Sequence, residues 1–493
     1  MKIAVLTSTT AEEMVKDIVT NDNKHGYNIE VVPLPVPVIS ILDTNTISKI
    51  ISRRKDILEK IRDSNLVMIP GLVRGDSSII EKVANVETYK GPKSLGILPY
   101  ALDFIHNGGK LDKQKSAEEV MGSITPKISY KTAFKIDNIE IPIRGPPVLI
   151  VAEIHPNTKV DEVESLAKRY VNDGAKIIII GSNLESDPSV IEKKIKIASN
   201  YAPIIAEISD ISLINRYRQA GIVGISTSAH LIEKDLEDIP NDLVLIIGDR
   251  NITKLKKVGS ELLSKGYKLI IDPVLGIPCI DFVKSINRYT KIIKSLNAPI
   301  LFSAADVTEE LEADTIGIHS LLATISIELR ASLYLVVEET YKSHRGVAEA
   351  REALRVAETA YSLKSTPRGL FSKLLVVKQN EKPITINDQL NYEYVNYIPP
   401  DYNLNDYIQI SVDYEKNEIK VVYKRNNKIL AALKGKHAMS LARELVKRVN
   451  LSLDHAAYLG YELSKAEIAL KLGKTYIQDE SIIIPPWMGE NGE

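Results

Sequence analysis

Cysteine is almost missing from this chain. The single cysteine, Cys279, excludes a disulfide within the chain and any zinc or iron–sulfur site built from several cysteines. An excess of charge is missing as well, because 63 lysine and arginine residues face 64 aspartate and glutamate residues. That balance does not favour nucleic acid or an anionic membrane as an electrostatic partner.

Long apolar runs are also absent from the sequence. No stretch approaches the roughly 18 residues that span a bilayer, and Met1–Leu6 leads into a strand pattern without the layout of a signal peptide. Hydrophobic residues are 44% and charged residues 26% of the chain, which is ordinary for globular proteins. We therefore expect a soluble cytoplasmic protein, and 493 residues suggest about two to four domains.

What the chain does have is a repeated strand–helix pattern in its middle. The predicted strands are short and rich in Ile, Val and Leu: Val148–Ile154, Lys176–Ile180, Pro203–Ile208, Ile222–Ser226, Leu243–Ile247, Lys268–Asp272, Pro299–Ser303 and Leu333–Glu338. Such runs are typical of parallel strands buried on both faces, and eight of them favour a closed (β/α)8 TIM barrel. Alternation over Phe134–Ile141 predicts a hairpin that can plug the N-terminal end of the barrel.

Two smaller regions flank this array. The first predicts an open α/β domain with strands Lys2–Leu6, Tyr27–Pro33 and Leu66–Pro70 and helices Ala11–Val19 and Thr44–Asp63. The last predicts an α+β domain with strands Ile408–Val412, Glu418–Tyr423 and Lys428–Leu433 and helices Ala438–Val449 and Asp454–Leu472. The predicted fold class is therefore α/β, with domains at 1–128, 129–371 and 372–493.

Two glycine-containing turns of the first region are candidate anion sites. Gly71–Ser78 follows a strand and opens a helix, and Tyr89–Lys93 is a second candidate. Free N–H groups at a helix N-terminus bind anions, but neither turn has a dinucleotide-binding or P-loop pattern. A tight loop is the alternative for both.

Carboxylates and small polar residues gather at the ends of the barrel strands, where such barrels assemble their active sites. The candidate residues are Glu153, Asn183, Glu207, Ser226, Asp272 and Asp306. Converging carboxylates suit a ligand with several N–H donors or a divalent metal. Because the histidines are scattered, we predict no metal site and leave Mg²⁺ open as a cofactor. Asp272 can accept two parallel hydrogen bonds from a planar N–H/N–H₂ face, such as the edge of a pterin.

Three segments carry a resemblance to a known family. Asp272-Pro273 follows the sixth strand, Glu207 closes the third, and Ser303–Thr308 follows the seventh. In these the barrel resembles the pterin-binding fold of dihydropteroate synthases and methyltetrahydrofolate–corrinoid methyltransferases. The whole chain, with Leu453–Leu470, is similar to archaeal dihydropteroate synthase-like proteins.

The departures from that family concern the diphosphate chemistry. The loop Glu153–Asn157 replaces the synthases' Asn-x-Thr-Pro-Asp-Ser-Phe segment, Ser226–Ser228 replaces Asn-Asp-Val-Ser, and Val336–Glu339 replaces Arg-Val-His-Asp. Asp306 is nearest to the position of the synthases' pterin-contacting lysine. Arg345, before the predicted helix Ala348–Ala360, can hold a phosphate, and a solvated capping turn is the alternative.

The resemblance implies a transferase of modified-folate biosynthesis that joins a hydroxymethyl-dihydropterin diphosphate to an arylamine. Glu153, Asn183, Glu207, Ser226 and Asp272 would bind the pterin. The predicted catalytic residues are Asp306 and Arg345, with Asp306 as proton donor or, alternatively, as a helix N-cap. Methyl transfer from a methyl-tetrahydropterin and a non-catalytic pterin-binding scaffold remain alternatives. The expected partners are a pterin and an arylamine or methyl acceptor, and a homodimer stays open.

Overall fold

The structure is a computed structural model of the whole chain. It describes residues 1–22, 25–122, 128–368, 370, 373–379, 392–396, 398 and 406–483. Contacts divide the chain into two compact units, one formed by 1–339 and 345–379, the other by 340–344 and 380–493. In the described residues no helix is long and apolar enough to cross a membrane. The division into three domains stays a prediction.

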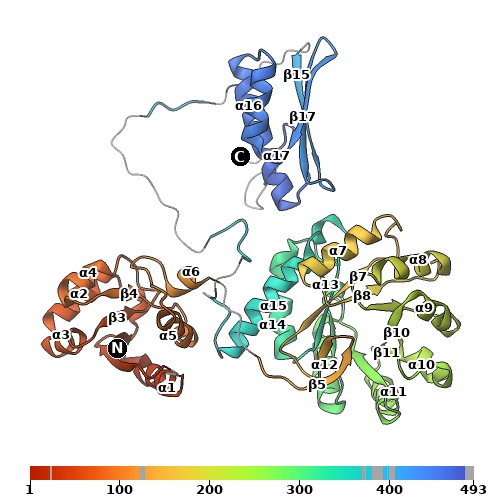
Figure 1. Cartoon of the computed structure of the whole chain (residues 1–493), viewed down its shortest axis with the longest axis horizontal. Helices are drawn as coiled ribbons and strands as arrows, with labels where there is room; N and C mark the ends of the chain where they lie inside the picture. The colour runs from red at the N-terminus through yellow and green to blue at the C-terminus, as the bar shows by residue number, and fades with distance from the viewer. Residues whose placement is uncertain are drawn as a thin grey trace. The chain divides into compact units, whose positions relative to one another are not determined.

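The first region is a parallel sheet in the order β2-β1-β3-β4, with helices on both faces (Figure 1). Its strands are β1 (Lys2–Ser8), β2 (Asn28–Leu34), β3 (Leu66–Ile69) and β4 (Thr88–Lys90). Its helices are α1 (Glu12–Asp22), α2 (Thr44–Arg53), α3 (Lys55–Arg62), α4 (Ser78–Ala84), α5 (Leu98–His106) and α6 (Ala117–Met121). One apolar cluster joins the sheet to α2, α3 and α4, and another joins it to α1, α5 and α6. The expected open α/β arrangement is confirmed.

The helix predicted over Thr44–Asp63 is wrong in one respect, because it breaks at Arg54 into α2 and α3. Ile47 and Ile51 are buried on α2, and Ile57 and Ile61 are buried on α3. Within each pair the spacing of four keeps both side chains on one helix face. The step of six from Ile51 to Ile57 does not fit that period, so the break lets both pairs face the sheet.

The middle region is a ring of parallel strands in the order β12-β11-β10-β9-β8-β7-β14-β13. The strands are β7 (Leu149–Ile154), β8 (Ile177–Ile180), β9 (Ile204–Glu207), β10 (Ile222–Ser228), β11 (Val244–Gly248), β12 (Lys268–Asp272), β13 (Leu301–Ser303) and β14 (Leu333–Val337). The ring closes where the N–H of Ile271 donates to the carbonyl of Pro299 at 2.9 Å. The predicted (β/α)8 barrel is therefore confirmed.

Helices surround the barrel, as Figure 1 shows for α7 to α12. They are α7 (Val163–Asp173), α8 (Pro188–Ala198), α9 (Ile214–Ala220), α10 (Ala229–Asp235), α11 (Ile252–Ser264), α12 (Phe282–Ser295), α13 (Ala305–Thr308), α14 (Thr315–Glu328) and α15 (Gly346–Ser362). Residues of alternate parity on the strands pack outward against these helices. The strands are thus buried on both faces, which explains their continuous apolar sequences.

A hairpin of β5 (Thr132–Ile136) and β6 (Ile139–Pro142) closes one end of the barrel. Its Ile136 and Ile141 belong to the apolar cluster inside the barrel, which also contains Leu333, the first residue of β14. The hairpin therefore covers the N-terminal end of the strands, as expected, and leaves the opposite end as the mouth.

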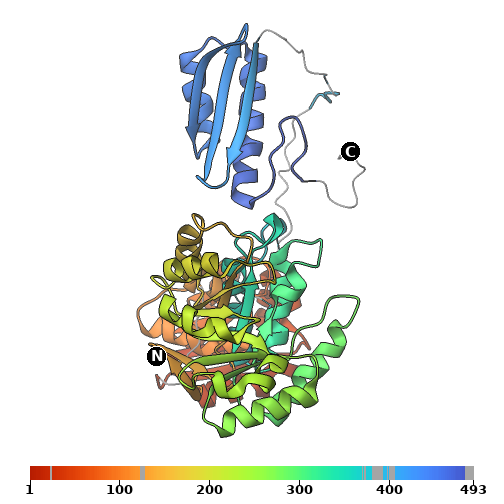
Figure 2. The same cartoon turned by 90° about the vertical axis from the view of Figure 1, so that its right-hand side faces the viewer.

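The C-terminal unit contains an antiparallel sheet of β15 (Asp406–Asp413), β16 (Glu418–Arg425) and β17 (Lys428–Gly435). Its helices α16 (Ala438–Arg448) and α17 (Leu453–Leu472) cover one face of that sheet (Figure 2). Leu445 and Leu463 pack with Ile419 and Val421 in a core of their own. The predicted α+β arrangement is confirmed.

Candidate functional site

The floor of the barrel mouth is the last layer of side chains that point into the barrel. Val151, Ile205 and Ile270 lie in the interior cluster, and the residue two positions later on a strand points the same way. Applied to seven of the strands, this rule gives the layer Glu153, Gly181, Glu207, Gly248, Asp272, Ser303 and Val337. On β10, whose register shifts between Ile222 and Gly224, pairing with Glu207 and Ile246 adds Ser226 to the layer. The mouth therefore has three carboxyl groups between small residues.

Glu153 lies against the glycine of the neighbouring strand end. A Cβ atom on Gly181 would be 2.5 Å from Glu153 Oε1, so only glycine leaves room for this carboxyl group. Burial raises the pKa of Glu153 to about 8, and the charges of Glu207, Asp306 and Glu339 add to the rise. Near neutral pH Glu153 is therefore mostly protonated and can donate a hydrogen bond.

Asp272 uses one carboxylate oxygen for the protein itself. Its Oδ1 accepts hydrogen bonds from the N–H of Val274 at 2.8 Å and from the hydroxyl of Tyr289 at 3.4 Å. Its Oδ2 faces Gly248, 3.7 Å from where a Cβ atom of that residue would be. Burial, followed by the charge of Asp306, raises the pKa of Asp272 to about 7. The group can therefore be ionised or neutral near physiological pH.

The loop after Asp272 is strained and firmly held. Val274 has a φ of 58°, a left-handed conformation that is costly for a β-branched residue. The Arg288 guanidinium donates to the carbonyl of Pro273 at 3.2 Å and to that of Val274 at 2.8 Å. Arg288 also pairs with Asp281 at 3.1 Å. These bonds fix the backbone that holds the Asp272 carboxylate.

Asp306 is the fourth carboxyl group of the mouth. It lies in the first turn of α13, whose N-cap is Ala304, so the alternative of an N-cap role for Asp306 is wrong. Burial raises the pKa of Asp306 to about 6, whereas the Ser303 hydroxyl and the charge of Arg250 lower it. The charge that adds to this rise is that of Glu310. A carboxyl group of this kind can give up a proton near neutral pH.

Glu207 lies at the end of β9, beside the loop that follows β8. It accepts a hydrogen bond from the N–H of Ser182 at 3.0 Å. Burial raises its pKa, and that N–H and the charge of His155 oppose the rise. His155 Nε2 is 3.4 Å from Glu339 Oε1. On the β7 side of the mouth, Glu207 therefore has the polar residues His155 and Glu339 near it.

Three other predicted residues have more local roles in the structure. Ser226 belongs to the inward layer at the end of β10. Asn183 Oδ1 accepts from the N–H of Glu185 at 3.1 Å and from the Ser186 hydroxyl at 2.8 Å, so it shapes the exposed loop after β8. Arg345 precedes α15 with a φ of 70°, and its guanidinium is 2.9 Å from Asp173 Oδ1. Among these three, only Ser226 contributes to the floor of the mouth.

The residues around Asp272 that sequence patterns did not single out are Tyr289 and Arg288. Both lie on α12, 16 and 17 residues beyond Asp272. They reach the loop because α12 packs back over β12, and nothing local in the sequence marks that contact. In the described part of the chain, no three or more His, Cys, Asp or Glu side chains are grouped so that they could hold a metal ion.

Comparisons with known proteins give a family match and several relatives. Residues 405–479 match the family model PterinBD-DUF4346. The chain is 26% identical to an uncharacterised protein of Methanocaldococcus jannaschii, covering 98% of this chain and 99% of that protein. A Yersinia pestis dihydropteroate synthase with a pterin–sulfa conjugate has a TM-score of 0.38 at 14% identity, covering 47% of this chain and 99% of that one. The Thermus thermophilus enzyme in complex with 6HMPPP has a TM-score of 0.37 at 16% identity, covering 43% and 94%.

The fold and the mouth define a (β/α)8-barrel protein with buried carboxyl groups at the carboxyl ends of its strands. Its C-terminal segment matches the PterinBD-DUF4346 model, and its whole length is similar to the uncharacterised protein of Methanocaldococcus jannaschii.

Proposed function

We propose that the barrel mouth binds a reduced pterin. The observation that carries this proposal is the half-buried layer of Glu153, Glu207 and Asp272, with Asp306 beside it. The pyrimidinone edge of a pterin presents an N–H and an N–H₂ group in one plane, and a carboxylate accepts both. Asp272 supplies that carboxylate, with Oδ2 directed toward the glycine-lined side of the mouth.

The unequal pKa values of the mouth suit a ligand with both donors and acceptors. Near pH 7 Glu153, with a pKa of about 8, donates a hydrogen bond, while ionised Asp272, with a pKa of about 7, accepts. A pterin ring has N–H donors on one edge and a carbonyl oxygen and ring nitrogens as acceptors. Glu207 and Ser226 complete the polar floor, between the small residues Gly181, Gly248 and Ser303.

The reaction that the family resemblance implies is condensation with an arylamine. The amine nitrogen forms a bond to the methylene carbon of the pterin, the carbon–oxygen bond breaks, diphosphate leaves with the electron pair, and the amine proton goes to solvent. Cations would have to hold the diphosphate. The charge of Arg250 acts on Asp306, but Arg345 is paired with Asp173 at 2.9 Å.

Methyl transfer is a second candidate, and Asp306 favours it. In that reaction the bond between a ring nitrogen and its methyl group breaks, the methyl group passes to a nucleophilic acceptor, and the electron pair stays on the nitrogen. A proton on that nitrogen makes it a better leaving group. Asp306, buried and with a pKa of about 6, can supply the proton.

Binding is tested by titrating the protein with 6-hydroxymethyl-7,8-dihydropterin in a calorimeter. Asp272→Asn replaces one acceptor oxygen by an N–H₂ group that faces the ligand's donors, so we expect about 10- to 100-fold weaker binding. The matched control is Asp210→Asn, an exposed carboxylate that caps the turn after β9, and its affinity should stay within about twofold of the wild type. Equal affinities of wild type and Asp272→Asn would refute the proposed role of Asp272 as the acceptor of the pterin's hydrogen bonds.

The two reactions are separated by their products. Condensation releases diphosphate when the protein is given the dihydropterin diphosphate and 4-aminobenzoate. Methyl transfer changes the visible spectrum of cob(I)alamin when methyl-tetrahydropterin is added, and Asp306→Asn should slow it at least about 10-fold without weakening pterin binding. Saturable pterin binding with neither product would favour the non-catalytic scaffold.

A further inference from the structure

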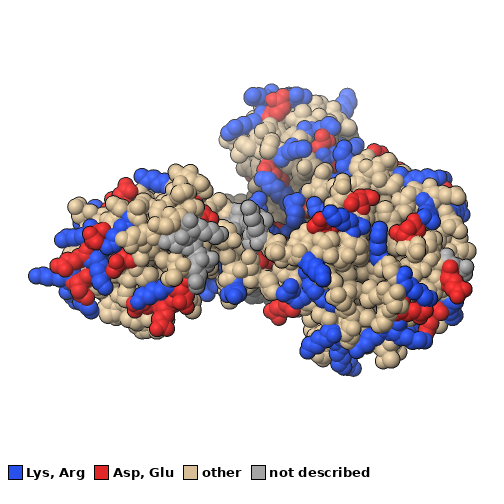
Figure 3. Space-filling view, turned by 60° about the horizontal axis from the view of Figure 1, so that its bottom comes forward, with Lys and Arg blue, Asp and Glu red and all other residues tan. Residues whose placement is uncertain are grey.

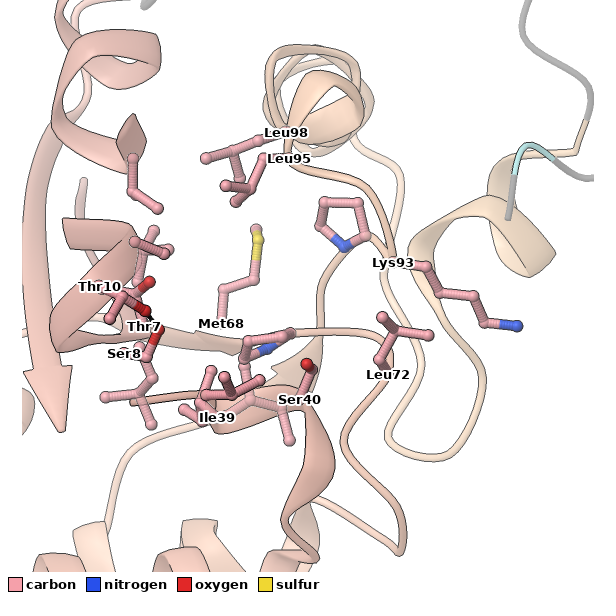
Figure 4. A pocket seen from close by; sticks show the side chains of 18 of the residues that line it. Thr7, Ser8, Thr10, Ile39, Ser40, Met68, Leu72, Lys93, Leu95 and Leu98 are labelled. Atoms are coloured by element: carbon pink, nitrogen blue, oxygen red, sulfur yellow. Dashed lines mark hydrogen bonds between the residues drawn. The ribbon is translucent and has the colours of Figure 1, made fainter. Parts of the chain in front are cut away.

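The N-terminal sheet has a cavity of about 250 Å³ at the carboxyl ends of its strands. Strand β1 lies between β2 and β3, so the chain leaves β1 toward one side and later returns on the other. Ligands of open parallel sheets bind at such a reversal of strand order. The cavity lies there, between the end of β1 and the end of β3, as the close-up in Figure 4 shows.

Most of the cavity wall is apolar. The apolar lining residues are Val5, Leu6, Ala11, Val15, Pro37, Val38, Ile39, Met68, Ile69, Pro70, Leu72, Pro92, Leu95 and Leu98. The polar ones are the hydroxyl residues Thr7, Ser8, Thr10 and Ser40, and Lys93. Figure 4 shows Thr7, Ser8 and Thr10 together on one wall, with Leu95 and Leu98 on another. Such a wall holds an apolar body and orients it by one polar end.

Of the three hydroxyl groups on that wall, that of Thr10 is engaged by the protein, whereas those of Thr7 and Ser8 can still bond to a ligand. Thr10 donates its hydroxyl to the carbonyl of Pro37, and Ser8 Oγ is 3.3 Å from Thr10 Oγ1. Thr7 is only 3% exposed, and in the described part of the chain its hydroxyl has no hydrogen-bond partner. The Thr7 hydroxyl is therefore free to donate a hydrogen bond to a ligand in the cavity.

The charges around the cavity argue against an anionic ligand. Lys93 Nζ pairs with Glu119 at 2.6 Å, and in Figure 4 its side chain extends away from the cavity. Helix α1 begins with two acidic residues, Glu12 and Glu13, which already occupy the favourable end of its dipole. No carboxylate lines the cavity, so a cation has no partner there.

The two glycine turns beside the cavity use their backbone N–H groups in hydrogen bonds to each other. These groups are therefore not free to bind an anion. The Gly71 N–H donates to the carbonyl of Pro92 at 2.9 Å, and the Gly91 N–H donates to that of Ile69 at 2.7 Å. A Cβ atom on Gly71 would be 2.5 Å from the Gly91 oxygen. At the following helix, Asp76 accepts the N–H of Ser78 at 2.8 Å. These are tight packing turns, the alternative that the sequence left open.

We propose that this cavity binds an uncharged, largely apolar ring compound with one hydrogen-bonding group, held by the hydroxyls of Thr7 and Ser8. Since a cavity of about 150 Å³ holds benzene, the volume here suits a ligand of about ten non-hydrogen atoms. The site is separate from the barrel mouth and does not rest on the pterin proposal.

The test uses Met68, whose side chain lies in the middle of the cavity wall in Figure 4. The full chain is labelled with ¹³C at its methionine methyl groups, and the Met68 signal is assigned with Met68→Leu. Three probes of one ring size are titrated: 2-naphthol, naphthalene and 2-naphthalenesulfonate. We expect saturable shifts of Met68 with 2-naphthol, about 5-fold weaker binding of naphthalene, which lacks the hydroxyl, and none of the sulfonate.

Variants locate the polar contact. Thr7→Val keeps the shape of the side chain and removes its hydroxyl, so it should lower the affinity for 2-naphthol to that for naphthalene and leave naphthalene unchanged. Thr20→Val, which removes an exposed hydroxyl on α1, is the control and should change neither affinity. An unchanged Met121 signal from α6, which packs against the core of the same N-terminal region, shows that each variant is folded there. A Met68 signal that no probe moves, equal binding by Thr7→Val, or binding of the sulfonate would overturn the proposal.

Discussion

At the scale of single residues, the buried carboxyl groups make stability depend on pH. Glu153 has a pKa of about 8 and Asp272 of about 7, both above the ordinary values near 4 that unfolded chains have. At pH values between the unfolded and the folded pKa, the folded state binds more protons than the unfolded state. The free energy of unfolding therefore falls as pH rises from 5 to 8. The expected loss is a few kcal/mol in free energy of unfolding, measured by urea denaturation at both pH values.

Glu153→Gln should remove much of this pH dependence, because the amide stays neutral throughout. It should also raise the stability at pH 8, where the wild type must bury a charge. The control Glu185→Gln changes an exposed side chain in the loop after β8 and should leave the pH dependence intact. A wild-type protein that is more stable at pH 8 than at pH 5 would contradict the burial of these groups.

Two glycines of the mouth layer should respond differently to one added methyl group. In Gly181→Ala the new Cβ would be 2.5 Å from Glu153 Oε1 and 2.9 Å from Pro156 Cδ, so we expect a loss of about 1–3 kcal/mol. In Gly248→Ala the nearest atom is 3.6 Å away, so stability should change by less than about 0.5 kcal/mol. Because that methyl group lies 3.7 Å from Asp272 Oδ2, pterin binding should still weaken. Equal melting temperatures of the two variants would contradict this geometry.

The direction of a side chain in the mouth could be predicted from sequence where it depends on one strand alone. Glu153, Glu207 and Asp272 each end an apolar run, and the alternation of strand side chains points all three into the barrel. The contacts of Asp272 with Tyr289 and of Arg345 with Asp173 could not be predicted. They depend on how helices pack around the ring, which leaves no periodic signal in the sequence.

At the scale of elements, the hairpin of β5 and β6 closes the N-terminal end of the barrel. Ile141 is fully buried in the interior cluster, whereas Ile139 is only partly buried beside it. Ile141→Ala should therefore cost about 2–5 kcal/mol, and Ile139→Ala should cost less. Urea denaturation of both variants measures the difference, and equal small losses would show that the hairpin does not close the barrel.

The barrel strands and the helices α2 and α3 show which features of the fold could be predicted from residue patterns. All eight barrel strands start and end within two residues of their predicted bounds, because each is an uninterrupted apolar run between turn residues. The break between α2 and α3 was not predicted, although its signal is present in the six-residue step from Ile51 to Ile57. A step of six residues is out of phase with the helix period of 3.6, so one continuous helix would turn one of the two pairs away from the sheet.

At the scale of the whole molecule, the chain consists of two compact units with separate cores. Acidic and basic side chains are interspersed over the face in Figure 3, in keeping with the net charge of −1. The four carboxyl groups of the barrel mouth all belong to the first unit. The effect of pH on stability should therefore be concentrated in that unit.

Thermal unfolding should accordingly show two transitions. The transition of the first unit should shift to lower temperature between pH 5 and pH 8, and that of the C-terminal unit should shift less. Residues 406–483 expressed alone should keep the second transition, since their sheet and helices share one core. Differential scanning calorimetry measures both, and a single transition that moves as a whole with pH would show that the units unfold together.

The central claim is that the barrel mouth holds a pterin on Asp272, and a crystal structure with bound 6-hydroxymethyl-7,8-dihydropterin tests it most directly. We expect the ring over the layer of Glu153, Glu207 and Asp272, with its N–H and N–H₂ groups within about 3.2 Å of the Asp272 carboxylate. A ring bound elsewhere, with Asp272 still bonded only to Val274 and Tyr289, would contradict it.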